Sequence, residues 1–292
     1  IMTAVLRIVE AAGARLDVRS IDVGEKIYRQ GITSGIDPAA WDALRERLDA
    51  YDREAAFAGA AAEAKLRAGF VGSFGLFLER AHIVQADDAH DYVLLSTPLG
   101  LDLDSSDDRL EPTTGWRLNV QLAPTRNLVD EAAGFLSLRA GARTYFDLGA
   151  ENGRSVLALR AAAGSILAAA RGDVPADRRF YAGGGGSVRG YAYQSIGPRD
   201  SRGEPAGGLS LVEAAAELRQ RLGGNWGAVV FVDAGGAAAS RRPASSELRI
   251  GAGGGVRYYT PIGAIRADIG LPLRHDERSG RFAVYIGIGQ AF

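Results

Sequence analysis

The carboxyl-terminal end of the chain alternates strictly between large apolar side chains and small or polar ones. Phe282, Val284, Ile286 and Ile288 occupy every second position. Because successive side chains of an extended strand point to opposite faces, this pattern predicts a β-strand with one apolar and one polar face. Blocks of about ten residues with the same alternation recur from Phe70 onward, which is typical of the strands of a membrane-spanning β-barrel.

Alternation alone does not distinguish a soluble sandwich, whose apolar face points inward, from a membrane barrel, whose apolar face points outward. The connections between the strands are more informative. Counting back from the carboxyl terminus, they are long at 275–280, short at 260–263, long at 238–247, short at 223–225 and very long at 172–208. Outer-membrane barrels combine short periplasmic turns with longer extracellular loops. We therefore expect an all-β fold, a transmembrane antiparallel β-barrel in the bacterial outer membrane, with Phe292 at the periplasmic end.

Eleven strands are expected from this pattern. They cover residues 53–66, 70–83, 91–104, 115–123, 135–147, 153–168, 209–222, 226–236, 247–260, 263–274 and 281–292. Residues 1–52 form a less regular part, in which Val5–Val9 and Arg15–Val23 are candidates for two further strands. The opening residues lack the basic start and apolar core of a signal peptide. We therefore expect the sequence to be a fragment whose native amino terminus is missing.

One segment of the amino-terminal part favours a helix instead of a strand. Pro38 is suited to a first helical position, and Trp41 and Leu44 follow at helical spacing. The sequence therefore predicts a short amphipathic helix at 38–50. The Ala-rich stretch 55–64 also has a high helix propensity and could extend this helix.

Composition and missing motifs exclude several classes of protein. The net charge is −1 and the chain has no Cys and three His, so a phosphate-binding surface for nucleic acid and a thiolate metal site are not expected. The run Gly183–Gly186 lacks the Gly-Lys-Ser/Thr ending of a phosphate-binding loop, and the acidic turn at 102–108 lacks calcium-loop spacing. We therefore expect no catalytic residues, no cofactor, no metal site and no enzymatic activity.

Four motifs, in order along the chain, carry a family resemblance. They are Asp107-Asp-Arg-Leu-Glu-Pro-Thr-Thr-Gly-Trp116, the tetrapeptide Val188-Arg189-Gly190-Tyr191 within the segment 180–199, Phe231-Val-Asp-Ala-Gly235 and Gly289-Gln-Ala-Phe292. Together they resemble the BamA and TamA superfamily of outer-membrane assembly factors, whose sixth extracellular loop carries Val-Arg-Gly-Tyr as its signature. The Gly-rich approach to the tetrapeptide, the tail that follows it to Arg199 and the segment 256–263 are more similar to the TamA family.

The resemblance covers residues 53–292 and implies an outer-membrane barrel domain, 16-stranded in the family. It also implies periplasmic POTRA domains, which are absent from this sequence. This chain then lacks its first barrel strands, or its residues 1–52 have diverged. The expected strand at 53–66 depends largely on the resemblance, which further implies that the loop at 172–208 folds back into the lumen.

The resemblance also implies a set of residues that hold this loop. Within the family the Arg of the tetrapeptide meets acidic residues of the inner wall, which correspond here to Glu217 and Asp233. The alternation agrees, because Asp233 lies on the strand face opposite Val230 and Val232. A guanidinium pairs with carboxylates through a planar fork that Lys reproduces poorly. We therefore expect Val188, Arg189, Gly190 and Tyr191 to dock the loop and maintain the barrel.

The last strand resembles the signal by which outer-membrane barrels are recognised for insertion. Its residues are Tyr285, Gly287, Gln290 and Phe292, and Gln290 departs from the usual aromatic residue. Glycine gives this strand little side-chain packing, so we expect weak pairing at the seam between the first and last strands.

These features predict a non-enzymatic assembly and translocation factor that inserts and secretes autotransporter-type and other β-barrel clients through the seam. The expected partners are the outer-membrane lipid bilayer, unfolded client proteins and a TamB-like partner anchored in the inner membrane. Two alternatives of another class are a two-partner secretion pore, which exports a polypeptide through the lumen, and a passive porin-like barrel. A soluble lipid-binding barrel is a third.

Overall fold

The computed structural model describes residues 42–292 except 87, 130–133, 150–152, 169, 243–247, 262 and 275–279. The candidate strands at Val5–Val9 and Arg15–Val23 lie outside the described residues. Within the described part, no helix is long and apolar enough to cross a membrane.

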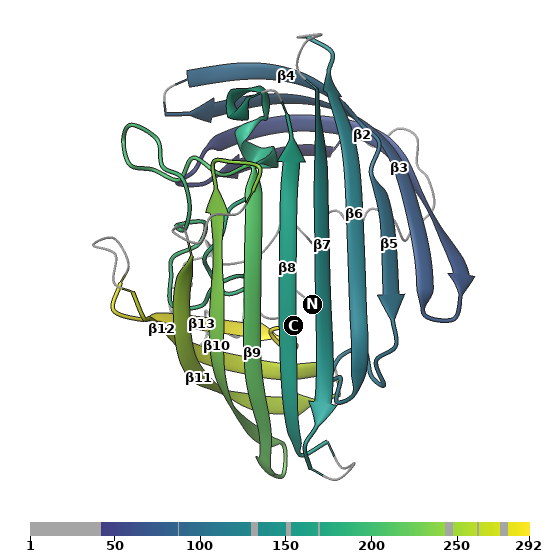
Figure 1. The fold of residues 1–292 in the computed structure, drawn as a ribbon, viewed down its shortest axis with the longest axis vertical. Coiled ribbons are helices and arrows are strands. Elements are labelled where there is room, and N and C mark those ends of the chain that lie inside the picture. The colour runs from purple at the N-terminus through teal and green to yellow at the C-terminus, as the bar shows by residue number, and fades with distance from the viewer. Residues whose placement is uncertain are drawn as a thin grey trace.

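Thirteen strands form one antiparallel sheet in the described residues. Neighbouring strands in the chain pair with each other, except that β4 and β5 share one position between β3 and β6. They are β1 (Asp42–Arg47), β2 (Asp52–Arg67), β3 (Phe70–Gln85), β4 (Asp88–Ser96), β5 (Leu99–Asp104), β6 (Gly115–Asn127), β7 (Gly134–Asp147), β8 (Ser155–Leu167), β9 (Ser210–Gly223), β10 (Trp226–Ala238), β11 (Arg249–Thr260), β12 (Gly263–Pro272) and β13 (Ala283–Ile288). Figure 1 shows β6 to β10 side by side, with β2 to β4 and β11 to β13 curving away at opposite ends. The expected all-β antiparallel fold is thereby confirmed.

The strand expected at 91–104 is divided into two. β4 and β5 both pair with β3 and with β6, so together they occupy one position in the sheet. Thr97 and Pro98 separate them, and Pro124 lies opposite on β6. Proline has no backbone N–H to donate to a ladder, so the two prolines interrupt the pairing at this level.

The helix expected at 38–50 is wrong, because residues 42–47 form strand β1. β1 pairs antiparallel with the start of β2, from Asp42 opposite Phe57 to Arg47 opposite Asp52. Residues 38–41 lie outside the described residues. The expected strand at 53–66 corresponds to β2, which pairs with β3 along almost its whole length. Hydrogen bonds to a neighbouring strand outweigh the local helix propensity of both segments.

The two faces of the sheet differ as the alternation predicts. On β9, Glu213, Glu217 and Arg219 are buried, while Leu218 and Leu222 between and beyond them are exposed. The exposed large apolar side chains of the strands from β9 onward are Leu218, Leu222, Trp226, Val230, Val232, Ile250, Val256, Tyr258, Ile265, Ile269, Leu271, Val284, Ile286 and Ile288. An outward apolar face and a polar concave face are the arrangement of a barrel wall in lipid.

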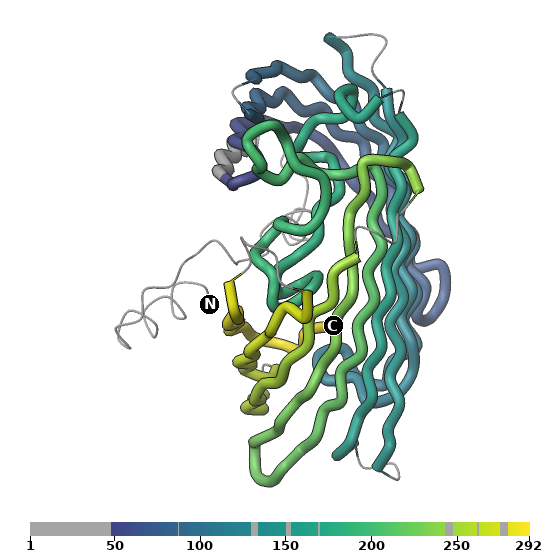
Figure 2. Tube along the Cα trace, turned by 60° about the vertical axis from the view of Figure 1, so that its left-hand side comes forward, coloured from purple at the N-terminus to yellow at the C-terminus, as the bar shows by residue number. Residues whose placement is uncertain are grey.

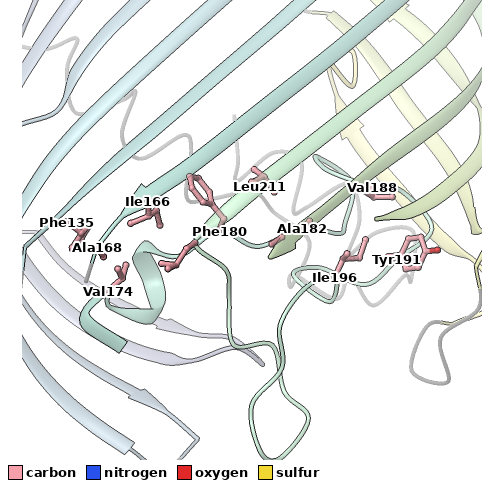
Figure 3. Packing of buried hydrophobic residues seen from close by; sticks show 12 residues of the cluster. Phe135, Ile166, Ala168, Val174, Phe180, Ala182, Val188, Tyr191, Ile196 and Leu211 are labelled. Carbon is pink, nitrogen blue, oxygen red and sulfur yellow. The ribbon is translucent and has the colours of Figure 1, made fainter. Parts of the chain in front are cut away.

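The connection between β8 and β9 covers the concave face. It contains the short 3₁₀ helices η2 (Arg171–Asp173) and η3 (Ala176–Arg178). Its apolar side chains pack with those of β7 to β10 in a cluster formed by Phe135, Ile166, Ala168, Val174, Phe180, Ala182, Val188, Tyr191, Ile196, Leu209, Leu211 and Ala237. Figure 3 shows this cluster extending from Phe135 and Ile166 to Val188 and Tyr191. The residues of the loop are therefore packed against the inner wall.

Candidate functional site

The guanidinium of Arg189 is the centre of the contacts between the loop and the wall. Its Nε lies 2.7 Å from Oδ2 of Asp233 on β10, and its Nη2 lies 2.9 Å from Oδ1 of the same carboxylate. The backbone N–H of Arg189 donates to Oδ2 as well, at 3.0 Å. Nη1 donates to Oε2 of Glu217 on β9 at 2.8 Å. The structure thus brings together the three charged residues that the sequence singled out.

Further charged residues complete this cluster. Arg219 donates from Nε to Oε1 of Glu217 at 2.8 Å. Asp268 on β12 lies 3.4 Å from Nη1 of Arg189 and accepts hydrogen bonds from Arg257 on β11. Three guanidinium groups therefore face three carboxylates, and a fourth, that of Arg266, lies 4.0 Å from Oδ2 of Asp268 at the margin of the cluster. We name these six residues the carboxyl-terminal anchor: Arg189, Glu217, Arg219, Asp233, Arg257 and Asp268.

The carboxyl-terminal anchor is almost completely removed from solvent. The side chains of Arg189, Glu217 and Asp233 are 2%, 0% and 2% exposed. Burial alone lowers the pKa of Arg189, but hydrogen bonding and charge from Asp233, and then from Glu217, raise it above its ordinary value. The ring of Phe231 also lies 3.4 Å from the Arg189 Cζ atom, where its π-face favours a cation. Arg189 is therefore held in its charged form.

The tetrapeptide depends on Gly190 for its close approach to the sheet. Gly190 has a φ of +101°, and a Cβ atom there would lie 2.7 Å from the carbonyl carbon of Leu271 on β12. Such a contact is shorter than van der Waals distance, and the backbone conformation disfavours L side chains. Val188 on the other side of Arg189 is fully buried in the apolar cluster of the loop.

Tyr191 and Tyr285 connect the tetrapeptide to the last strands. The backbone N–H of Gly190 donates to the Tyr285 hydroxyl on β13 at 2.9 Å, and this hydroxyl donates to the carbonyl of Tyr191 at 3.1 Å. The hydroxyl of Tyr191 lies 2.9 Å from the carbonyl of Arg274, just beyond β12. The tetrapeptide therefore touches strands from β9 to β13.

The expected strand at 281–292 is too long at its end. β13 stops at Ile288, because Gly289 has a φ of +91° and turns the chain away from the sheet. Gln290 then accepts a hydrogen bond from Nε of Arg257, and the carbonyl of Phe292 accepts one from Arg219. These two residues lie on the concave face, beyond the end of β13.

The side chain of Phe292 is buried against the inner wall. It packs with Tyr145 of β7, Val156 and Ala158 of β8 and Ala215 of β9. The expectation that Gln290 and Phe292 continue the last strand is therefore wrong. Tyr285 and Gly287 do lie on β13, with Gly287 opposite Arg266 of β12.

Sequence reasoning missed Asp268, Arg219 and Arg257 as members of the cluster. The alternation placed Asp268 and Arg219 on the polar faces of their strands, and Arg257 alternates with Val256 and Tyr258 in the same way. That signal identifies inward charges. It does not identify which charges on different strands meet, because this depends on the register between strands.

The site offers no arrangement for metal binding. In the described part of the chain, no group of three or more His, Cys, Asp or Glu side chains is placed to hold a metal ion. The carboxylates of the carboxyl-terminal anchor are instead occupied by guanidinium groups. The arrangement can fix the position of a loop, and it contains no pair of groups set up for acid–base or nucleophilic chemistry.

Comparison with known families agrees with this architecture. The Omp85 superfamily domain matches residues 40–292. The chain belongs to the Omp85 superfamily. It is accordingly an outer-membrane β-barrel domain, and the expected resemblance is confirmed at the level of the superfamily.

Two curated proteins match parts of the chain. The outer membrane protein assembly factor BamA of Nitratidesulfovibrio vulgaris is 34% identical over 143 residues, which are 45% of this chain and 18% of that protein. A stretch of 45 residues, 15% of this chain, is also 47% identical to isocitrate dehydrogenase [NADP] of Rickettsia prowazekii and covers 9% of that enzyme. The latter match is too short to show a family. The chain therefore spans less than a fifth of either curated relative.

Two solved structures share the fold. BamA from Haemophilus ducreyi lacking POTRA domains 1–3 has a TM-score of 0.67 at 17% identity, covering 84% of this chain and 56% of that one. CdiB from Escherichia coli has a TM-score of 0.57 at 18% identity, covering 81% of this chain and 45% of that one. Identities this low show a common fold and nothing about clients.

Proposed function

We propose that this Omp85 domain helps to insert and secrete β-barrel clients at a seam next to β13, without an enzymatic reaction and without nucleotide. The observation that carries the proposal is the position of β13 at an edge of the described sheet. Among the described residues, β12 is the only strand that pairs with it. Backbone groups left unpaired in hydrocarbon cost several kcal/mol each. An edge of this kind accepts an added strand by β-augmentation.

Two properties of β13 support a seam that opens. β13 pairs with β12 over six residues, whereas β10 and β11 pair over ten. Ile286 on its outer face is 72% exposed, which leaves this side chain in the lipid beside any added strand. Short pairing leaves fewer hydrogen bonds to break, so a client strand can compete for this edge.

The carboxyl-terminal anchor supports the proposal in a second way. We propose that Val188, Arg189, Gly190 and Tyr191 act as a docking motif, with Glu217 and Asp233 as its acidic partners on the wall. A buried ion pair mainly specifies one arrangement, because its desolvation cost offsets much of the Coulomb attraction. Docking of this kind keeps the wall beside the seam in one conformation while β13 remains available.

Assignment of the chain to the TamA family within the superfamily is also a proposal. The segments 183–199 and 256–263 are similar to the TamA family, which implies autotransporter-type clients, a TamB-like inner-membrane partner and POTRA domains in the whole protein. We propose this assignment because 183–199 lies in the loop that carries the tetrapeptide, and 256–260 is the end of β11, which pairs with β12 next to β13. To test this assignment, assembly of an autotransporter is compared with assembly of a general barrel client. Both are measured with and without the TamB-like inner-membrane partner.

A client-capture experiment tests the seam. The chain has no cysteine, so Ile286→Cys introduces a single reactive group at the free edge, to be combined with cysteines scanned along the terminal strand of a stalled client. We expect disulfides in one strand register. The matched control is Val230→Cys on β10, which is also lipid-facing but lies on a strand paired with both β9 and β11. Equal capture at both positions, or insertion without capture at Ile286→Cys, contradicts the proposal.

A polypeptide-secretion pore of the two-partner type is the alternative. The tetrapeptide motif is shared with that class, but the loop between β8 and β9 is packed on the concave face, where a translocating chain would have to pass. Planar-bilayer conductance separates the two functions. The secretion pore requires a large conductance that increases when the loop is released, whereas the seam function requires none.

A further inference from the structure

The loop between β8 and β9 makes a second set of ionic contacts, far along the sheet from Arg189. Asp177 and Arg178 of η3 lie against Arg53 of β2 and Glu79 of β3. Nε of Arg53 lies 3.0 Å from Oδ2 of Asp177, and Nη2 of Arg53 donates to Oε1 of Glu79 at 2.5 Å. Arg178 also donates to Glu79. We name these four residues the amino-terminal anchor.

The amino-terminal anchor is buried on both sides of the contact. The side chains of Arg53, Glu79 and Asp177 are 9%, 7% and 6% exposed, and that of Arg178 is 23% exposed. Its two Arg and two acidic residues balance in charge, as those of the carboxyl-terminal anchor do. A closely paired cluster of this burial is expected to hold its two elements in one arrangement.

Apolar and polar contacts extend this interface. Ala176 of η3 packs in one cluster with residues of the β1–β2 turn, β2 and β3, namely Ala50, Tyr51, Ala55, Ala81 and Ile83. Nη1 of Arg179 donates to Oε1 of Gln85 at 2.8 Å, and Nε2 of Gln85 donates to the carbonyl of Ala50 at 3.0 Å. The start of the loop therefore contacts the β1–β2 turn and both strands of the β2–β3 hairpin.

The two anchors lie at opposite ends of the sheet. The amino-terminal anchor involves β2 and β3, and the carboxyl-terminal anchor involves β9 to β12. Within the described residues the sheet ends at β1 and at β13, which do not pair with each other. Figure 2 shows the loop between the purple amino-terminal strands and the yellow carboxyl-terminal strands. The loop therefore connects two parts of the wall that strand pairing does not join directly.

The stretch 179–188 between the anchors packs against the inner wall. Phe180, Ala182 and Val188 are buried in the apolar cluster of the loop. The carbonyl of Gly186 accepts a hydrogen bond from Nη1 of Arg160 on β8 at 2.5 Å, and the carbonyl of Ser187 accepts one from Nη2 at 2.8 Å. A stretch fixed at several points can transmit a constraint from one anchor to the other.

We propose that residues 171–191 form a strap with two docking sites. The second site consists of Arg53, Glu79, Asp177 and Arg178. Together with Arg189, this site sets the separation of the two sheet edges. The inference rests on the docking role of Arg189 proposed above. Because the stretch between the anchors is also held on β8, each anchor constrains its own end of the sheet. Releasing one anchor frees one end, so releasing both should add the two effects.

Distance measurements between spin labels test the strap in the full chain. Since the sequence has no cysteine, Ala60→Cys on the exposed part of β2 and Ile286→Cys on β13 give one label near each edge. In lipid nanodiscs we expect a narrow distance distribution. Asp177→Asn and Arg189→Ala should each broaden it and shift it to longer distances. The double variant should show about the sum of the two single changes.

Asp91→Asn is the matched control. It removes the pair between Asp91 and His82, 2.9 Å apart on the outer face of β3 and β4, without touching the strap, and should leave the distribution unchanged. An unchanged distribution in Asp177→Asn, or a double variant no different from Arg189→Ala alone, overturns the strap. If Arg189→Ala does not fold, Tyr285→Phe replaces it, because it removes the hydrogen bonds of Tyr285 with Gly190 and Tyr191 beside that anchor. Because no client is present, failure here leaves the capture result at Ile286→Cys as a separate test of the proposed function.

Discussion

The two anchors of the loop share one chemical principle and differ in depth. Both balance guanidinium groups against carboxylates on the concave face. In the carboxyl-terminal anchor, Arg189, Glu217 and Asp233 are at most 2% exposed, whereas Arg178 of the amino-terminal anchor is 23% exposed. Water can replace part of a lost contact only at the second site. Loss of a charge should therefore lower the stability of the protein more at the anchor that solvent does not reach.

Removing the central guanidinium should have the largest effect. Arg189→Ala leaves the Asp233 carboxylate buried without its fork, and breaking a buried pair on one side costs about 3–5 kcal/mol. We expect a lower free energy of unfolding in urea-titrated lipid vesicles. Arg189→Lys should recover only part of this loss, because an ammonium cannot reproduce the bidentate geometry. Stability of Arg189→Lys equal to that of the unchanged chain would mean that the fork is irrelevant.

Blocking the close approach of the tetrapeptide should have the next largest effect. Gly190→Ala adds a Cβ atom 2.7 Å from a backbone carbon of Leu271 at a φ of +101°, and overpacking of this kind costs about 1–3 kcal/mol. The same unfolding assay measures it. The control is Gly224→Ala in the β9–β10 turn, where φ is +54° and no atom lies within 4 Å. Equal losses in the two variants would show that backbone conformation alone is responsible.

Weakening the amino-terminal anchor should destabilise the protein less than Arg189→Ala does. Glu79→Gln retains the shape of the side chain but removes the charge that faces Arg53 and Arg178. Hydrogen bonds to charged groups contribute about 1.5–3 kcal/mol, and exposure of Arg178 reduces the loss toward the lower value. A loss of stability as large as that of Arg189→Ala, measured by the same urea titration, would show that the two anchors contribute equally to stability.

Removing one hydroxyl should have the smallest effect. Tyr285→Phe deletes the group that accepts from the Gly190 N–H at 2.9 Å and donates to the Tyr191 carbonyl. The net contribution of a neutral hydrogen bond is about 0.5–1.5 kcal/mol. We expect slightly faster exchange of the Gly190 amide hydrogen and a small loss of stability. An unchanged exchange rate at Gly190 would show that this contact does not hold the tetrapeptide.

Local sequence preferences and contacts between distant residues disagree at several places in the chain. The Ala-rich segment of β2 has helix propensity but becomes a strand because β3 pairs with it, and the family resemblance was needed to predict this. The segment 42–47 had no such support, and its helical spacing led to the wrong prediction. Gly289 opens a motif that the sequence shows, but its turn away from the sheet depends on polar partners for Gln290 and Phe292 that come from β9 and β11.

The alternation in the sequence is enough to predict strands with one apolar and one charged face, because a period of two is a property of the extended backbone. The lengths of the connections and the motifs were needed to predict that the apolar face points outward. The sequence also identified Arg189 and two of its partners through a motif. The tertiary structure was needed to show that Asp268 and Arg257 join Arg189 and its partners, that Phe292 turns inward and that η3 contacts β2 and β3. Each of these depends on contacts between residues far apart in the chain, and strand register and loop path decide which inward charges meet.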